Sequence, residues 1–225
     1  MVNTTELRVY GRESVISFHK TTEPFGGLSN MAAGYSLNIN GLYIRTSEAL
    51  YQACRFPHMP EVQQLIIGQA SPMTAKMKTK PYRENSREDW NRVRIRIMRW
   101  CLHVKLAQNA RKFGDLLLST GDRPIVEQSR RDAFWGAKPI DAGKLTGLNV
   151  LGRLLMELRE EIRSVGLENL LSANPPKVSN FLLLDKPIGV ITGEPIAARR
   201  DRPLLLLKSG QQLTLEDQVG KKEAR

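Results

Sequence analysis

The chain centres on a twelve-residue stretch, Ile125-Val126-Glu127-Gln128-Ser129-Arg130-Arg131-Asp132-Ala133-Phe134-Trp135-Gly136. Its first two residues are typical of a short buried strand, and its last two of a turn where the backbone can approach a ligand closely. The two carboxylates, Glu127 and Asp132, lie close in sequence to the aromatic residues Phe134 and Trp135. This combination suits a site that stacks a flat ring and transfers protons. The alternative interpretation is a loop that closes the core, in which Phe134 and Trp135 fill the interior and Asp132 caps a turn.

Length and composition favour one domain with a hydrophobic core and leave room for an appendage, because the chain has 225 residues of which 41% are hydrophobic. No apolar run approaches the roughly 20 residues that span a membrane, and no signal-peptide pattern is present, so we expect a soluble cytoplasmic protein. Cys54 and Cys101 are too few for a disulfide framework, and the three histidines show no zinc spacing. We therefore expect neither a metal nor a cofactor.

The charge predicts an anionic partner. The formal net charge is +11, and residues 75–112 hold twelve basic residues against three acidic ones. A solvated helix face accounts for most of these side chains, although a few aimed at a phosphate would suffice for an active site. Interleaved aromatic residues, the mark of a single-strand binding track, are missing. Charge alone does not choose between nucleic acid and a phosphorylated small molecule.

A β-hairpin is predicted for residues 35–44, because Asn40-Gly41 favours positive φ at both turn positions. Thr46 or Ser47 caps the helix that follows at once, which places Glu48 in its first turn. The plain interpretation of Glu48 is an acid favoured by the helix dipole. The sharper one is a catalytic or ribose-binding carboxylate held at the end of a rigid hairpin.

Periodicity and caps predict the other elements. Further helices are expected at residues 61–69, after the cap Ser71-Pro72, from a capping box at Ser86, at 113–119 and at 149–162, and strands at 7–10 and 15–18. The apolar stripe that ends at Ile162 predicts a core complete by Val165. Beyond it, β-like runs at 181–184, 189–192, 203–207 and 211–215 follow the linker Asn174-Pro175-Pro176. The prediction is an α+β protein: a compact, mainly helical domain with a small sheet and hairpin at residues 1–165, and a β-rich C-terminal extension at 166–225 whose end is frayed.

Spaced motifs run through residues 15–163: Ile16-Ser17-Phe18, Phe25-Gly26-x-x-Ser29-Asn30, Asn40-Gly41, Thr46-Ser47-Glu48, Tyr51-Gln52-Ala53-x-x-Phe56, Trp90, Met98, Lys105, Leu117-Leu118-x-Thr120-Gly121, Val126-Glu127, Asp132-x-x-Trp135-Gly136 and Asn149-x-Leu151-Gly152-x-Leu154-Leu155-Met156-x-Leu158-Arg159. In this order they resemble the YbiA-like, or NADAR (NAD and ADP-ribose associated), family. The resemblance implies a compact, mainly helical fold with a small sheet, and N-glycosidase activity. Substrates of the family include phosphoribosylamino pyrimidine intermediates of riboflavin synthesis and ADP-ribosylated guanine.

Carried over by position, the resemblance implies a catalytic role for Glu48, Glu127 and Asp132. Glycosidic cleavage passes through an oxocarbenium-like state, which a nearby carboxylate stabilises while an acid or a positioned water completes the exchange. The implied substrate-binding residues are Asn30, Arg55, Lys105, Trp135, Gly136 and Asn149. The implied partner is a phosphorylated ribosyl or ADP-ribosyl substrate, free or carried on nucleic acid, and no membrane partner is expected.

Two positions depart from the family pattern. Relatives commonly have lysine where this chain has Arg55, and an aromatic residue where it has Met31. If the chemistry uses a lysine amine as nucleophile toward the ribose C1, arginine cannot replace it, because guanidinium stays protonated. Arg55 could still bind phosphate through two parallel hydrogen bonds. Two alternatives to an active glycosidase therefore stay open: a catalytically weak module that binds ADP-ribose or nucleotides, and a basic nucleic-acid-binding protein.

Overall fold

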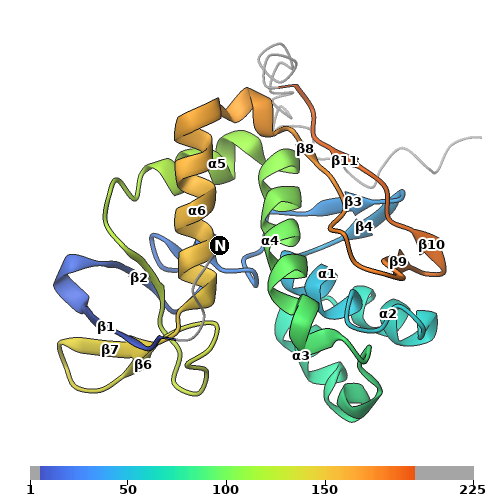
Figure 1. Ribbon diagram of the computed structural model, residues 1–225, viewed down its shortest axis with the longest axis horizontal. Coiled ribbons are helices and arrows are strands. Elements are labelled where there is room, and N and C mark those ends of the chain that lie inside the picture. Colours follow the sequence, from blue (N-terminus) through green and yellow to red (C-terminus); the bar gives the residue numbers. More distant parts are fainter. Residues whose placement is uncertain (1–5, 196–225) are drawn as a thin grey trace, which may run out of the picture.

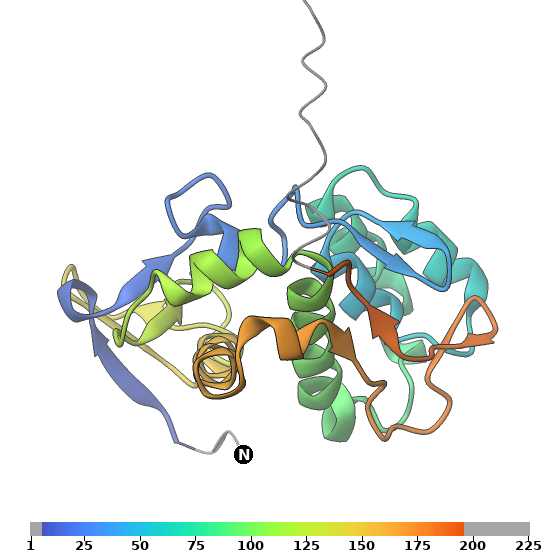
Figure 2. The same ribbon diagram turned by 90° about the horizontal axis from the view of Figure 1, so that it is seen from above.

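Two long helices form the centre of the protein. The computed structural model describes residues 6–195, and in it α4 (Trp90–Gln108) packs against α6 (Val150–Val165) (Figure 1). Seen from above, the strands that include β1, β6 and β7 lie on one side of this pair, and α1 to α3 with a hairpin lie on the other (Figure 2). This mixture of helices and small sheets confirms the predicted α+β class.

The strands on the first side hold the central stretch in place. A three-stranded antiparallel sheet has the order β1 (Arg8–Gly11), β7 (Lys144–Gly147) and β6 (Lys138–Pro139). Next to it, β2 (Ile16–Phe18) pairs in parallel with β5 (Ile125–Glu127), so that Phe18 lies opposite Glu127. Ile125 and Val126 are completely buried, which confirms the predicted strand.

The hairpin is also confirmed. Strands β3 (Leu37–Ile39) and β4 (Leu42–Ile44) pair around Asn40 and Gly41, whose φ angles are 53° and 83°. The cap of α1 (Ser47–Ala53) is Thr46, whose hydroxyl accepts the Ala49 N–H at 3.3 Å. The rigid hairpin therefore fixes where the first turn of α1 begins.

Two shorter helices complete this side of the protein. They are α2 (Pro60–Ile67) and α3 (Pro72–Lys78), and Ser71 caps α3 by accepting the Thr74 N–H at 3.4 Å. The capping box predicted at Ser86 is wrong, because the Ser86 hydroxyl donates to the Arg83 carbonyl and α4 begins only at Trp90. The remaining helices are α5 (Ala110–Leu118) and the 3₁₀ turns η1 (Arg12–Ser14), η2 (Gly26–Leu28), η3 (Lys80–Asn85) and η4 (Leu167–Leu170).

The apolar stripe on α6 predicted a core that ends at Ile162, but the core continues beyond this residue. Residues from the following segment belong to the same buried cluster: Leu170, Ala173, Phe181, Leu183, Ile188 and Ile191. Phe181, for example, packs edge-on against Trp100 of α4, with ring centroids 4.9 Å apart. The segment contains the short pairs β8 (Ser172–Ala173) with β11 (Ile191–Thr192), and β9 (Leu182–Leu183) with β10 (Lys186–Pro187).

The division of the chain at residue 165 stays a prediction. The strands expected at residues 203–207 and 211–215 lie outside the described residues. In residues 6–195, no helix combines the length and the apolar character that crossing a bilayer requires.

Candidate active site

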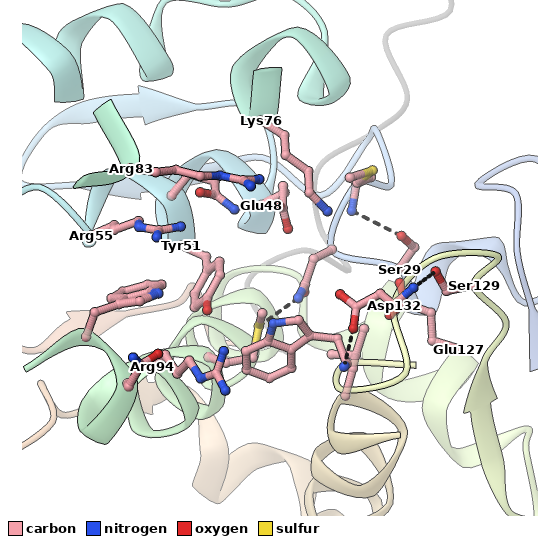
Figure 3. A pocket seen from close by; sticks show the side chains of 18 residues that line it. Ser29, Glu48, Tyr51, Arg55, Lys76, Arg83, Arg94, Glu127, Ser129 and Asp132 are labelled. Atoms are coloured by element: carbon pink, nitrogen blue, oxygen red, sulfur yellow. Dashed lines mark hydrogen bonds between the residues drawn. The ribbon is translucent and has the colours of Figure 1, made fainter. Parts of the chain in front are cut away.

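A pocket of about 290 Å³ brings the central stretch together with α1, α3 and α4. In the view of Figure 3, Arg55, Arg83 and Arg94 lie on one side and Glu127 and Asp132 on the other, with Glu48 and Lys76 between them. The remaining lining residues are Ser29, Asn30, Met31, Tyr51, Gln52, Trp90, Asn91, Met98, Ser129, Trp135 and Leu151. The pocket is therefore basic at one end and acidic at the other.

The hairpin and the loop before it position Glu48. Its backbone N–H donates to the Asn30 carbonyl at 3.0 Å, and its carboxylate accepts the Gln52 side-chain N–H at 2.9 Å. Glu48 is buried and one turn of α1 separates it from Gln52. The acid that the helix dipole favours also lines the pocket, so its catalytic or ribose-binding role stays a prediction that the geometry allows.

Glu127 sits at the end of β5, where its backbone N–H donates to Asn149 Oδ1 at 3.1 Å. Burial raises the pKa of its carboxyl group to about 7, and the nearby negative charges of Glu48 and Asp132 act in the same direction. The ammonium of Lys76 partly opposes this shift. A carboxyl group with a pKa near neutrality can donate or accept a proton at physiological pH, as acid–base catalysis requires.

Asp132 both caps a turn and lines the pocket. One carboxylate oxygen accepts the backbone N–H groups of Phe134 and Trp135, each at 2.9 Å. The turn holds the Trp135 ring edge-on to Tyr51, with centroids 5.6 Å apart, and Tyr51 in turn contacts Trp90 at 5.1 Å. The core-closing interpretation of this loop and the site interpretation are thus compatible.

The basic end of the pocket is partly fixed by aromatic rings. Arg55 donates to Ser86 Oγ at 2.6 Å, and its guanidinium lies 5.1 Å from the Trp90 ring. Arg94 lies 3.8 Å from the Phe134 ring. Guanidinium groups held against aromatic faces keep a fixed orientation, which suits recognition of a phosphate by paired hydrogen bonds. Burial lowers the pKa of Arg55, but a guanidinium remains charged at neutral pH.

Residues 17–163 match the model of the NADAR domain, and all the residues that line the pocket fall within this range. The chain belongs to the NADAR domain family. Curated NADAR relatives include the N-glycosidase YbiA of Escherichia coli K12, 34% identical over 154 residues that make up 67% of this chain and 90% of the relative. An N-glycosidase of Nostoc punctiforme is 35% identical over 152 residues, which cover 67% of this chain and 94% of that protein.

Two further comparisons extend the NADAR assignment. A riboflavin biosynthesis protein of Vibrio vulnificus is 34% identical over 158 residues, which cover 70% of this chain and 41% of that protein. The solution structure of E. coli YbiA matches with a TM-score of 0.58 at 34% identity, and covers 69% of this chain and 88% of YbiA. Family and relatives together place the chain among the N-glycosidases in general. Strand β1 and residues 164–195 lie outside the NADAR match.

Lys105 lies outside the pocket, although it had been expected to bind substrate. It is completely buried, and its ammonium donates to the carbonyls of Gly27 at 2.6 Å and Ser29 at 3.0 Å. The rings of Tyr35 and Phe113 pack against it at 4.4 and 4.2 Å. Burial lowers the Lys105 pKa. In this structure Lys105 holds the loop that carries Ser29 into the pocket.

Asn149 and Gly136 also lie behind the pocket wall and not on it. Asn149 has a φ of 48°, and its side chain donates to the Ile125 carbonyl at 2.8 Å while accepting the Glu127 N–H. A Cβ at Gly136 would lie 2.4 Å from the Glu127 carbonyl oxygen, so only glycine allows this approach. Both residues position Glu127, and neither caps a helix through its side chain nor touches the pocket. Of the predicted site, the structure brings together Asn30, Glu48, Arg55, Glu127, Asp132 and Trp135.

The sequence contains a signal for two lining residues that were not assigned to the site. Tyr51 and Gln52 follow Glu48 by three and four residues, so all three share one face of α1, and Arg55 follows by seven, in the turn after the helix ends. Helical spacing counted from Glu48 would have found them. Lys76, Arg83 and Arg94 carried no such signal, because nothing distinguishes them from the other bases of residues 75–112.

Proposed function

We propose that this NADAR protein hydrolyses the N-glycosidic bond between a base and a phosphorylated ribose. Two substrates fit the proposal: a phosphoribosylamino pyrimidine of riboflavin synthesis, and guanine that carries ADP-ribose, either free or on nucleic acid. The observation that carries the proposal is the polarity of the pocket, in which three arginines lie on the side opposite Glu127 and Asp132, with Glu48 and Lys76 between them. Such a pocket suits a ligand with an anion at one end and a centre that becomes positive at the other.

The basic end supports binding of the phosphate. Arg55, Arg83 and Arg94 line it, and Arg55 presents a guanidinium that Trp90 and Ser86 already orient. Phosphate held there would place the ribose toward Glu48 and Glu127. This arrangement orients the scissile bond before the reaction begins, which lowers the entropic part of the barrier.

The acidic end supports the chemistry. In the proposed step the protonated Glu127 gives its proton to the leaving nitrogen, and the electron pair of the C1–N bond goes to the base. Positive charge develops at the ribose C1, and the Glu48 carboxylate stabilises this charge and takes a proton from the attacking water. The water oxygen bonds to C1, so the products are the free base and a sugar with a C1 hydroxyl. Proton exchange with solvent then restores both acids.

A catalytically weak binding module is the main alternative, and the Glu127 environment argues against it. Placing a half-buried carboxyl group beside Glu48 and Asp132 opposes its ionisation. A site that only held an anionic ligand would have no use for three carboxyl groups among its lining residues. The same acids would repel the backbone of nucleic acid, so phosphates can approach only at the basic end.

The test is a panel of substrates analysed by chromatography for the released base. A phosphoribosylamino pyrimidine, ADP-ribosylated guanosine and an oligonucleotide with ADP-ribosylated guanine are each incubated with wild-type protein and with Glu127→Gln. We expect base release from at least one of them with wild type and none with Glu127→Gln. Asn91→Ala, which alters an exposed pocket residue without ionisable groups, serves as the matched control and should stay active. If all three substrates bind but no base is released, the binding-module alternative is correct.

A further inference from the structure

Two buried hydrogen-bond acceptors in the pocket have no donor. In the described part of the chain, Asn30 Oδ1 and Gln52 Oε1 lack any hydrogen-bond partner, and both side chains are more than nine-tenths buried. Both residues line the pocket. A buried acceptor that is left unpaired destabilises the folded protein, so two of them in one pocket require an explanation.

The orientation of each amide follows from its other contact. The Gln52 nitrogen donates to the Glu48 carboxylate at 2.9 Å, and a flipped amide would set its oxygen against that carboxylate. The Asn30 nitrogen lies 2.8 Å from the Met98 sulfur, which can accept a hydrogen bond but cannot donate one. In both side chains the amide oxygen is therefore the atom without a hydrogen-bond donor.

The unpaired acceptors select for a ligand that brings donors. Each hydroxyl group of a ribose can donate one hydrogen bond, and the two on C2 and C3 lie side by side on the ring. Gln52 is one helical turn from Glu48, the carboxylate placed at the reacting C1, so the 2-hydroxyl, on the carbon next to C1, comes within its reach, with the 3-hydroxyl beside it. This step relies on the proposed function, because a phosphate at the basic end is what turns the ribose toward α1.

We infer that Asn30 and Gln52 form a subsite for the 2- and 3-hydroxyls of the sugar and make the enzyme specific for ribosyl over deoxyribosyl compounds. Both oxygens are buried. Each side chain therefore has to rotate as the sugar enters, which gives up its contact with the Glu48 carboxylate or the Met98 sulfur and brings the oxygen to the sugar hydroxyls. Binding of a diol then supplies the donors that these two oxygens lack.

The test uses sugar phosphates that cannot be cleaved. The probes are 1,4-anhydro-D-ribitol 5-phosphate and its 2-deoxy and 3-deoxy analogues, which have no anomeric substituent, and calorimetry measures their dissociation constants. With wild-type protein we expect each missing hydroxyl to weaken binding about tenfold, the value of one hydrogen bond near the upper end of the usual range. This comparison needs no variant and so does not depend on whether a variant folds.

Variants then assign the hydroxyls. Gln52→Met and Asn30→Leu remove one acceptor each. Each variant should bind 1,4-anhydro-D-ribitol 5-phosphate and one of its two deoxy analogues with equal affinity, because the hydroxyl missing from that analogue no longer has an acceptor. The analogue concerned should differ between the two variants. Asn91→Leu makes the same kind of change at an exposed lining amide and should keep the wild-type ratios.

The outcomes separate this inference from the proposed function. If all three probes bind wild-type protein with the same affinity, the hydroxyl subsite is refuted while the phosphate-binding part of the proposed function stands. If none of them binds, the proposed function and this inference both fail. Discrimination that is unchanged in Gln52→Met and Asn30→Leu would also overturn the assignment to these two residues.

Discussion

The raised pKa of Glu127 makes the stability of the protein depend on pH. We predict that Glu127→Gln stabilises the fold relative to wild type, and that this advantage grows as the pH rises from about 4.5 to about 7. The physical reason is that the unfolded chain ionises Glu127 at its ordinary pKa, whereas the fold resists ionisation until a higher pH. Glutamine keeps the shape of the side chain and cannot ionise.

The magnitude follows from the shift. A move of the pKa from 4.5 to about 7 corresponds to about 3 kcal/mol, since one pKa unit is worth about 1.4 kcal/mol. Wild-type stability relative to the variant is therefore highest below pH 4.5, falls as the pH rises, and levels off above pH 7. The difference between the two proteins cancels the contributions of all other titrating groups that the substitution leaves alone.

Urea denaturation, monitored by tryptophan fluorescence at several pH values, measures this difference in the free energy of unfolding. Ser129→Ala is the matched control, because Ser129 lines the same pocket and has no ionisable group, so its free energy of unfolding should stay parallel to wild type. A difference between Glu127→Gln and wild type that stays constant from about pH 4.5 to about pH 8 would refute the claim that the fold opposes ionisation of Glu127.

Two substitutions and a truncation test the support of β5, the binding of phosphate and the extent of the core. Asn149→Gly keeps the left-handed backbone but removes both amide hydrogen bonds to β5, and should lower stability by about 2–4 kcal/mol in thermal unfolding; an unchanged melting temperature would show that these bonds do not matter. Arg55→Lys keeps a cation but loses the fork that Ser86 orients, and should weaken sugar-phosphate binding by ~1–3 kcal/mol in calorimetry; higher turnover with a sugar adduct that borohydride can trap would instead show that an amine is needed there. A chain that ends at Val165 should fail to fold, because it lacks apolar residues of the core, whereas a chain that ends at Pro195 should unfold cooperatively like the full protein; a soluble, cooperative 1–165 fragment would contradict this.

Local rules predicted those elements whose signals lie within a few residues. The hairpin followed from Asn40-Gly41, the start of α1 from Thr46, and the buried strand β5 from Ile125 and Val126. The same rules misplaced the start of α4, because the Ser86 hydroxyl is engaged by Arg83 and Arg55 and is not free to cap a helix. A tertiary contact there outcompetes a local capping motif.

The site was predictable where chemistry and position coincide. Glu48, Glu127 and Trp135 could be named through the family resemblance, because local pattern alone also allows a helix-start acid or a ring in a loop a purely structural role. The sequence does not reveal that Lys105 points away from the pocket toward the loop at Ser29, since a buried lysine and a substrate-binding lysine look alike in a helix. Which bases of residues 75–112 reach the pocket depends on how α3 and α4 pack, and no local pattern encodes that.

The proton that Glu127 is proposed to donate can be followed directly in the pH dependence of kcat/KM for base release. If Glu127 is the general acid, wild-type kcat/KM falls as the pH rises through about 7, and Glu127→Gln shows neither this step nor appreciable turnover at any pH. Wild-type turnover that stays level from about pH 6 to about pH 9, together with a Glu127→Gln variant that releases base at the wild-type rate, would contradict the account.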